Sequence, residues 1–211
     1  MALRQITFPV GPLACNCTLL GDEASGRAVV IDPGAQVEEI VQRLSEHGWR
    51  LEAILVTHGH IDHIGGANEL HRRSGAPVWL NPRDREQVEL LEVQARWIGV
   101  PPPPAPSIAG ELDCRARLEL AGSRLEVLET PGHTQGSVSL YLPSESKLFA
   151  GDTLFSGSIG RTDLPGGDFA LLQRSLREVV RQLPDATVVI PGHGPETTIA
   201  RERRSNPFLR G

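Results

Sequence analysis

Residues 57–63 read Thr57-His58-Gly59-His60-Ile61-Asp62-His63 and follow a short apolar run at residues 51–56. Three histidines and one carboxylate within six residues form the kind of donor set that holds zinc or iron. A strand that ends in a turn can direct several side chains toward one point, and Gly59 allows the backbone to bend sharply there. The stretch therefore predicts a strand followed by ligands for one or two metal ions, with a solvated polar turn as the alternative.

Three more polar residues repeat this local pattern farther along the chain. Each follows an apolar run that is typical of a strand, and each has a glycine beside it. They are His133, Asp152 and His193, after the apolar runs at residues 125–128, 148–150 and 187–190. Strand ends of this kind can converge on one edge of a sandwich. The two remaining histidines, His47 and His71, lie in predicted helices and are interpreted as ordinary surface residues.

Composition limits the class of protein and its partners. The chain has 211 residues, of which 39% are hydrophobic and 22% charged, and a net charge of −5, which is typical of a soluble globular protein. The acidic balance gives no reason to expect nucleic acid or an anionic membrane as a partner. No apolar run approaches the roughly 20 residues of a membrane-spanning helix, and no secretory signal is visible at the N-terminus.

The three cysteines are Cys15, Cys17 and Cys114. Their odd number and the absence of a Cys-x-x-Cys pair indicate reduced thiols, and hence a cytoplasmic location. Cys15 and Cys17 flank Asn16 and would share one face of an extended segment. We interpret them as buried structural thiols, with a redox or metal-binding role as the alternative.

Apolar periodicity predicts strands and helices in a similar order in both halves of the chain. Helices are expected over residues 37–48, 67–73, 84–98 and 169–183, with a short one before Pro207. Strands are expected at residues 19–20, 28–31, 51–56, 76–80, 118–120, 125–127, 138–142, 148–150 and 187–190, with a hairpin turn at 121–123. This order predicts an α/β fold in which two sheets pack face to face with helices outside. We expect one domain, residues 1–211.

The spacing of the candidate ligands resembles that of the metallo-β-lactamase superfamily. The family's His-x-His-x-Asp-His motif is matched by the first four of these ligands, and its later ligands by the other three, over nearly the whole chain. The resemblance implies a four-layer αββα sandwich of two mixed β-sheets and a site for two divalent metal ions. By position, one ion would be held by His58, His60 and His133, the other by Asp62, His63 and His193, with Asp152 bridging both.

The resemblance also implies a chemistry. Two ions about 3.5–4 Å apart can share a water and lower its pKa toward roughly 7, so a metal-bridging hydroxide would attack a carbonyl. Asp62 could accept or relay a proton. Zinc is the first expectation, and iron or manganese would also suit this donor set. The predicted activity is hydrolysis of an ester, thioester, lactone or amide.

Within the superfamily the chain looks most like the glyoxalase II group, the hydroxyacylglutathione hydrolases. The run Gly151-Asp152-Thr153-Leu154-Phe155, followed by Gly160-Arg161, is similar to that group's loop after the bridging ligand. Arg161 matches the position of a basic residue that binds the glutathione backbone, and an ion pair with Asp163 is its alternative role. The sequence resembles a shorter bacterial branch that lacks the separate C-terminal helical substrate-binding domain.

Several rival activities remain open at this point. Asp152 argues against the true β-lactamases, and the acidic charge argues against the superfamily's nucleases. Persulfide dioxygenases, which use one iron at positions matching His58, His133 and Asp152, are the main rival. A lactonase, another ester hydrolase and a non-catalytic metal-binding module are further alternatives. The expected partner is a small thioester, with a glutathione-derived thioester among the candidates. Neither the thiol carrier, the metal nor the oligomeric state follows from the sequence.

Overall fold

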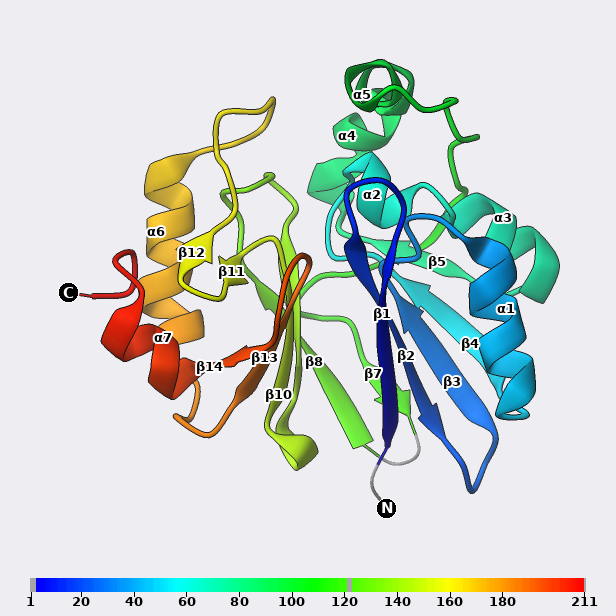
Figure 1. Ribbon diagram of the computed structural model, residues 1–211, viewed down its shortest axis with the longest axis horizontal. Helices are drawn as coiled ribbons and strands as arrows, with labels where there is room; N and C mark the ends of the chain where they lie inside the picture. Colours follow the sequence, from blue (N-terminus) through cyan, green and yellow to red (C-terminus); the bar gives the residue numbers. More distant parts are fainter. Residues whose placement is uncertain (1–2, 121–122, 211) are drawn as a thin grey trace.

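A computed structural model describes residues 3–120 and 123–210 of the chain. Two six-stranded β-sheets pack face to face, and helices cover their outer faces (Figure 1). The predicted αββα sandwich is therefore confirmed. Within these two described ranges, no helix is both long and apolar enough to cross a membrane.

The first sheet comes from the N-terminal half of the chain. Its strands lie side by side in chain order: β1 (Arg4–Val10), β2 (Cys15–Asp22), β3 (Arg27–Ile31), β4 (Arg50–Leu55), β5 (Val78–Leu80) and β6 (Ile108–Glu111). The first three pair antiparallel, whereas β3 to β6 are parallel. Two helices, α1 (Val37–Glu46) and α3 (Ala67–Ser74), cover the outer face of this sheet (Figure 1).

The second sheet comes from the C-terminal half. Its strands, in spatial order, are β14 (Thr197–Thr198), β13 (Val188–Pro191), β10 (Lys147–Gly151), β9 (Val138–Leu142), β8 (Ser123–Glu129) and β7 (Leu118–Leu120). Only β10 and β13 pair in parallel among these. The outer face is covered by α6 (Phe169–Glu178) and α7 (Ile199–Ser205) (Figure 1). Asp168 caps the start of α6, because its carboxylate accepts the N–H of Leu171 at 2.9 Å.

Three apolar layers hold the four structural layers together. The middle layer lies between the sheets and takes Leu20 and Leu55 from the first sheet and Leu140, Phe149 and Ile190 from the second. Each of these side chains is at most 2% exposed, and burying one contributes about 1.5–3 kcal/mol. This shared layer fixes the two sheets relative to each other, and so fixes which strand ends can meet.

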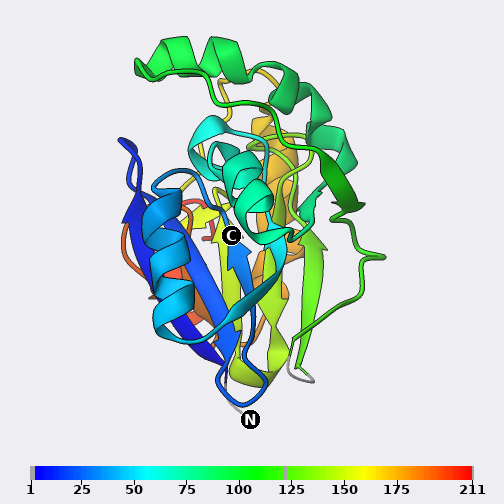
Figure 2. The ribbon, with the colours of Figure 1, turned by 90° about the vertical axis from the view of Figure 1, so that its right-hand side faces the viewer.

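Residues 84–98, predicted as one helix, form two. They are α4 (Arg85–Glu89) and α5 (Leu91–Ile98), which lie across the upper edge of the sandwich (Figure 2). The helix is interrupted because the side-chain amide of Gln94 donates to the carbonyl of Gln87 at 2.9 Å. The other end of that amide accepts the N–H of Ile61 at 2.8 Å. The single-helix prediction was wrong because this long-range contact leaves no trace in the apolar periodicity.

Five strands were not predicted. They are β1, β6, β14 and the pair β11 (Leu154–Phe155) and β12 (Ser158–Ile159), which forms a small separate hairpin. Two-residue strands are too short to show an alternating pattern. The predicted hairpin of β7 and β8 is confirmed, although residues 121–122 of its predicted turn lie outside the described residues.

Candidate metal centre

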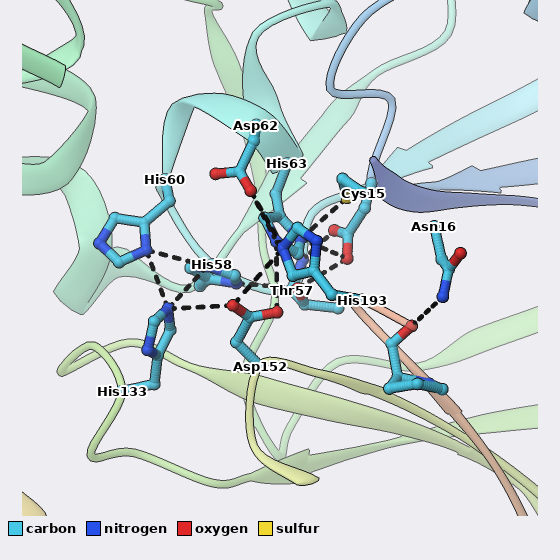
Figure 3. Close-up of polar contacts among 12 residues, drawn as sticks. Cys15, Asn16, Thr57, His58, His60, Asp62, His63, His133, Asp152 and His193 are labelled. Carbon is cyan, nitrogen blue, oxygen red and sulfur yellow. Dashed lines mark hydrogen bonds and ion pairs between the residues drawn. The ribbon is translucent and has the colours of Figure 1, made fainter. Parts of the chain in front are cut away.

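Loops at one edge of the sandwich carry all seven predicted ligands. The loop after β4 and the short helix α2 (Ile61–Ile64) supply four of them, and the loops after β8, β10 and β13 supply one each. Their polar atoms point toward one another (Figure 3). The seven are His58, His60, Asp62, His63, His133, Asp152 and His193. Because each half of the chain contributes, the cluster joins the ends of both sheets.

Three histidine nitrogens form the first group. Nε2 of His58, Nδ1 of His60 and Nε2 of His133 lie 2.9–3.2 Å from one another (Figure 3), and all three side chains are buried. Each pair of nitrogens can share at most one proton, so the three lone pairs cannot all be satisfied by hydrogen bonds within the group. A cation at their centre would satisfy all three.

The second group contains Asp62, His63 and His193. Nε2 of His193 lies 3.1 Å from Oδ2 of Asp62 and 3.3 Å from Nε2 of His63. The His63 nitrogen is also 3.6 Å from the same carboxylate oxygen. Two imidazoles and one carboxylate are a donor set that suits zinc, iron or manganese.

Asp152 lies between the two groups. Its Oδ1 is 3.4 Å from Nε2 of His63, and its Oδ2 is 3.5 Å from Nε2 of His133 and 3.7 Å from Nε2 of His193. The Oδ1 atom is buried and has no hydrogen-bond partner. An unpartnered buried carboxylate oxygen is costly, and a metal ion would remove that cost. The residues therefore fit a metal centre on chemical grounds.

Outer hydrogen bonds orient most of the imidazoles. Four of the five donate Nδ1–H to an oxygen outside the centre, which leaves Nε2 free to face inward. The donor and acceptor pairs are His58 with Thr57 Oγ1 at 3.1 Å, His63 with Asp32 Oδ2 at 3.0 Å, His133 with the Arg161 carbonyl at 2.7 Å and His193 with the Leu13 carbonyl at 3.0 Å. His60 is the exception, because its Nδ1 faces the centre.

Asp32 is an outer partner that was not predicted as part of the site. Its Oδ1 accepts the N–H of Thr57 at 2.7 Å, and its Oδ2 accepts the hydroxyl of Thr57 at 2.8 Å as well as Nδ1–H of His63. It also supports His58 indirectly, because Thr57 accepts from that ring. A left-handed backbone at Asp32, with φ of 53°, turns the chain so that Gly34 packs against the ligand loop. The Asp-Pro-Gly sequence was the available signal.

Asp84 is a second outer residue that sequence reasoning missed. It is fully buried, and it accepts N–H of Gly59 at 2.8 Å, the hydroxyl of Thr134 at 2.7 Å and N–H of Gly136 at 2.6 Å. Burial raises the pKa of this carboxyl, although the three donors oppose the effect. One side chain therefore connects the loop after β4 with the loop that carries His133.

The surroundings shift the pKa values of His58, His60 and the two aspartates. Burial, together with the neighbouring imidazoles, lowers the pKa of His58 and lowers that of His60 to about 3. Burial alone would raise the pKa values of Asp62 and Asp152, but His63 and other nearby imidazoles lower both overall. Neutral imidazoles beside ionised carboxylates are the protonation states that metal binding requires.

His63 and His193 behave differently. Burial lowers their pKa values, but the surrounding acidic side chains, Asp62 and Asp152 among them, outweigh burial and raise both. These two rings therefore hold protons more tightly than an ordinary histidine. A cation entering the second group would have to displace such a proton.

The two predicted surface histidines lie outside the cluster. The ring of His47 stacks against Trp49 with a centroid distance of 4.7 Å. The ring of His71 donates from Nδ1 to the carbonyl of Ala76 at 2.8 Å. Both side chains are half-buried and have local contacts, whereas the prediction was that they are ordinary surface residues.

Cys15 and Cys17 are fully buried on β2, whereas Cys114 is exposed, and all three thiols are free. Burial raises the pKa of Cys15 to about 12 and raises that of Cys17 strongly. Cys15 also lies beside the centre, with Sγ 3.5 Å from Nδ1 of His63. These observations support structural thiols.

We therefore expect iodoacetamide to alkylate one cysteine of the folded protein, Cys114, and all three after denaturation, because only an accessible thiolate reacts. Intact-mass and peptide mass spectrometry would measure this. A Cys114→Ser variant serves as the control and should take up no label while folded. Rapid labelling of Cys15 in the native protein would contradict the structural role.

A cleft of about 640 Å³ opens onto the centre. Its walls include His60, Asp62, Asp152 and Arg161. The guanidinium of Arg161 makes two 2.7 Å contacts with the Asp163 carboxylate, one from Nε and one from Nη2. Arg161 thus lines the cleft, as its predicted substrate contact requires, and also forms the ion pair that was its alternative role.

Comparison with known proteins agrees with this geometry. A family model described as the metallo-beta-lactamase superfamily matches residues 10–193. The "Hydroxyacylglutathione hydrolase GloC" of Haemophilus influenzae is 39% identical over 209 residues, which cover 96% of each chain. The chain therefore belongs to the metallo-β-lactamase superfamily, a superfamily of metallo-hydrolases.

Two solved structures are similar over almost their whole length. One, described as TTHA1623 in a di-iron-bound form, is 38% identical, has a TM-score of 0.87 and covers 97% of this chain and 100% of its own. The other, described as BLEG-1 B3 metallo-beta-lactamase, is 38% identical and has a TM-score of 0.91. The match covers 99% of this chain and 100% of the other. Two proteins with this fold and the same level of identity to this chain are thus described differently, one as di-iron-bound and the other as a β-lactamase.

Proposed function

We propose that this protein is a metal-dependent hydrolase of the glyoxalase II type, which cleaves a small thioester. The observation that carries the proposal is the meeting of seven predicted ligands at the floor of an open cleft. The similarity to GloC, over 96% of both chains, favours a thioester among the substrates of the superfamily. Residues 1–211 would act as one domain, since one apolar layer is shared by both sheets.

We assign seven residues to two metal ions. His58, His60 and His133 would hold one ion, Asp62, His63 and His193 the other, and Asp152 both. Bound divalent ions supply a water of lowered pKa and polarise a carbonyl oxygen. Zinc, iron and manganese all accept imidazole and carboxylate, and the di-iron form of TTHA1623 keeps iron among the candidates.

The chain's own residues would orient the reaction and manage its proton. Asp62 lines the cleft, and its lowered pKa keeps the carboxylate ionised. It would accept the proton of the attacking water and relay it toward the leaving thiolate. Asp32 and Thr57 would hold the rings of His58 and His63 in the required tautomer. Arg161, at the edge of the cleft, would contact the thiol portion of the substrate.

A second candidate is β-lactam hydrolysis, which the similarity to BLEG-1 favours. The sequence argument from Asp152 against β-lactamases loses force, because a chain 38% identical to this one bears that name. Both reactions would use the same centre to attack a carbonyl carbon. They differ in the leaving group, which is a thiolate in one case and an amine in the other.

The proposal is tested by assaying the purified, metal-loaded protein with S-lactoylglutathione, a lactone, a β-lactam and glutathione persulfide. We expect thiol release from the thioester and about two metal ions per chain. His133→Ala should lose both the activity and bound metal. His47→Ala is the matched control, because that ring lies outside the cluster and stacks only on Trp49. One iron per chain with oxygen uptake on the persulfide would replace the hydrolase by a dioxygenase, and turnover of the β-lactam alone would favour the second candidate.

A further inference from the structure

The mouth of the cleft is unusually apolar for a surface. Two of its side chains, Leu13 in the loop between β1 and β2 and Trp97 on α5, are 46% and 55% exposed. Ile98, Phe155 and Ile159 line the same cleft. Large apolar side chains that gather around a concave site mark a surface that binds an apolar group.

The charge of the residues that line the cleft also favours an uncharged ligand. Among the described residues that line it, Arg161 is the only lysine or arginine. Asp163 faces it with two 2.7 Å contacts, so the pair has no net charge. A carboxylate on the substrate would have to displace Asp163 before it could form a bidentate contact with this guanidinium.

The backbone at Arg161 is held in place by its contacts with the ligand residues. Its carbonyl accepts Nδ1–H of His133 at 2.7 Å. The preceding residue, Gly160, lies so close to Asp152 that an added Cβ would meet the Asp152 carbonyl oxygen at 1.9 Å. The chain at residue 161 therefore cannot shift without disturbing the centre, and Asp163 rather than the backbone decides where the guanidinium points.

We propose that the cleft prefers thioesters whose thiol portion is uncharged and apolar over thioesters of glutathione, and that Asp163 sets this preference by neutralising Arg161. The inference rests on the proposed function and names its substrate class. Asp163 is a positioning residue, since it acts on the substrate only through Arg161. The apolar mouth would hold the thiol portion, while the shared acyl group lies over the centre.

Two substrates with the same acyl group test the preference: S-lactoylglutathione, which is anionic, and the S-lactoyl ester of benzyl mercaptan, which is neutral and aromatic. We expect the wild-type kcat/KM to be at least tenfold higher for the benzyl ester. Asp163→Asn should lower KM for the glutathione ester about fivefold, the upper range for an exposed ion pair, with kcat unchanged. The benzyl ester should respond less than twofold.

Two further variants separate this effect from general changes of charge or fold. Arg161→Gln combined with Asp163→Asn should cancel the gain with the glutathione ester, because the freed guanidinium is absent. Glu23→Gln is the matched control: it removes one negative charge from a similarly exposed ion pair, Arg4 on β1 with Glu23 in the turn after β2, outside the cleft. It should leave KM for both esters unchanged.

Each outcome decides a different point. A wild-type preference for the glutathione ester, or an equal response of both esters to Asp163→Asn, would overturn the inference while leaving a thioesterase. Failure of the metal-loaded protein to hydrolyse either ester would overturn the proposed function, and the inference with it.

Discussion

Asp152→Ala is expected to abolish hydrolysis, with a loss of about 10³-fold or more in kcat, because metal ions supply several kcal/mol of charge stabilisation and each 1.4 kcal/mol is tenfold. Asp152 is the one ligand within 3.4–3.7 Å of histidines from both groups. Its removal would leave each group without its shared carboxylate, so bound metal should fall as well. Metal analysis of the purified variant, beside the thioester assay, would measure both effects.

The matched control is another aspartate in the same half of the chain. Asp168 caps α6 through the N–H of Leu171, so Asp168→Ala should cost about 1 kcal/mol of unfolding free energy and leave the metal content unchanged. Thermal unfolding would show that both variants are folded. An Asp152→Ala protein that kept its full metal content and activity would contradict the bridging assignment.

The second large effect is expected for Asp32→Asn, which preserves the shape of the side chain. In the folded protein both carboxylate oxygens of Asp32 accept, Oδ1 from the N–H of Thr57 and Oδ2 from its hydroxyl and from His63. Asparagine has one acceptor and one NH₂ donor, so in either orientation a donor meets a donor. We expect metal affinity to fall about 10–100-fold, the usual effect of losing an outer partner.

The readout for Asp32→Asn should be specific to the imidazole. A chelator competition would measure metal affinity, and nitrogen chemical shifts would report whether His63 still carries its proton on Nδ1. The control is Asp22→Asn, another buried aspartate of the first sheet, which accepts from the N–H groups of Ala24 and Ser25 at a distant turn. That variant should keep wild-type metal affinity. Equal loss of affinity in both variants would show a general defect in folding rather than a role at the centre.

Much of the fold could be predicted because its signals are local. The helix α1 buries Val37, Ile40 and Leu44, and this spacing is visible in the sequence. The interrupted helix at residues 84–98 could not be predicted, since the break depends on Gln94 reaching both Gln87 and the ligand loop. A contact from a side chain to the backbone of a loop distant in sequence leaves no periodic signal.

The same distinction holds for the candidate site. Ligands such as His133 and His193 could be identified because each follows an apolar strand and has a glycine beside it. Asp84 lies in no such context, although it connects two ligand loops through three donors. Asn16 was likewise missed, and its side chain joins β2 to the loop of His193 by donating to the carbonyls of Pro191 and Gly194 at 2.9 Å.

The sequence by itself therefore determined the layered fold and the identity of the seven candidate ligands, because residue type, strand spacing and neighbouring glycines are local properties of the chain. Only the tertiary structure decided which oxygens orient the imidazoles. It also decided that Arg161, the one arginine among the described residues that line the cleft, is paired with Asp163. These features depend on how loops from both sheets pack at a single edge. Packing at that edge follows from burial of the layer between the sheets, which no single segment encodes.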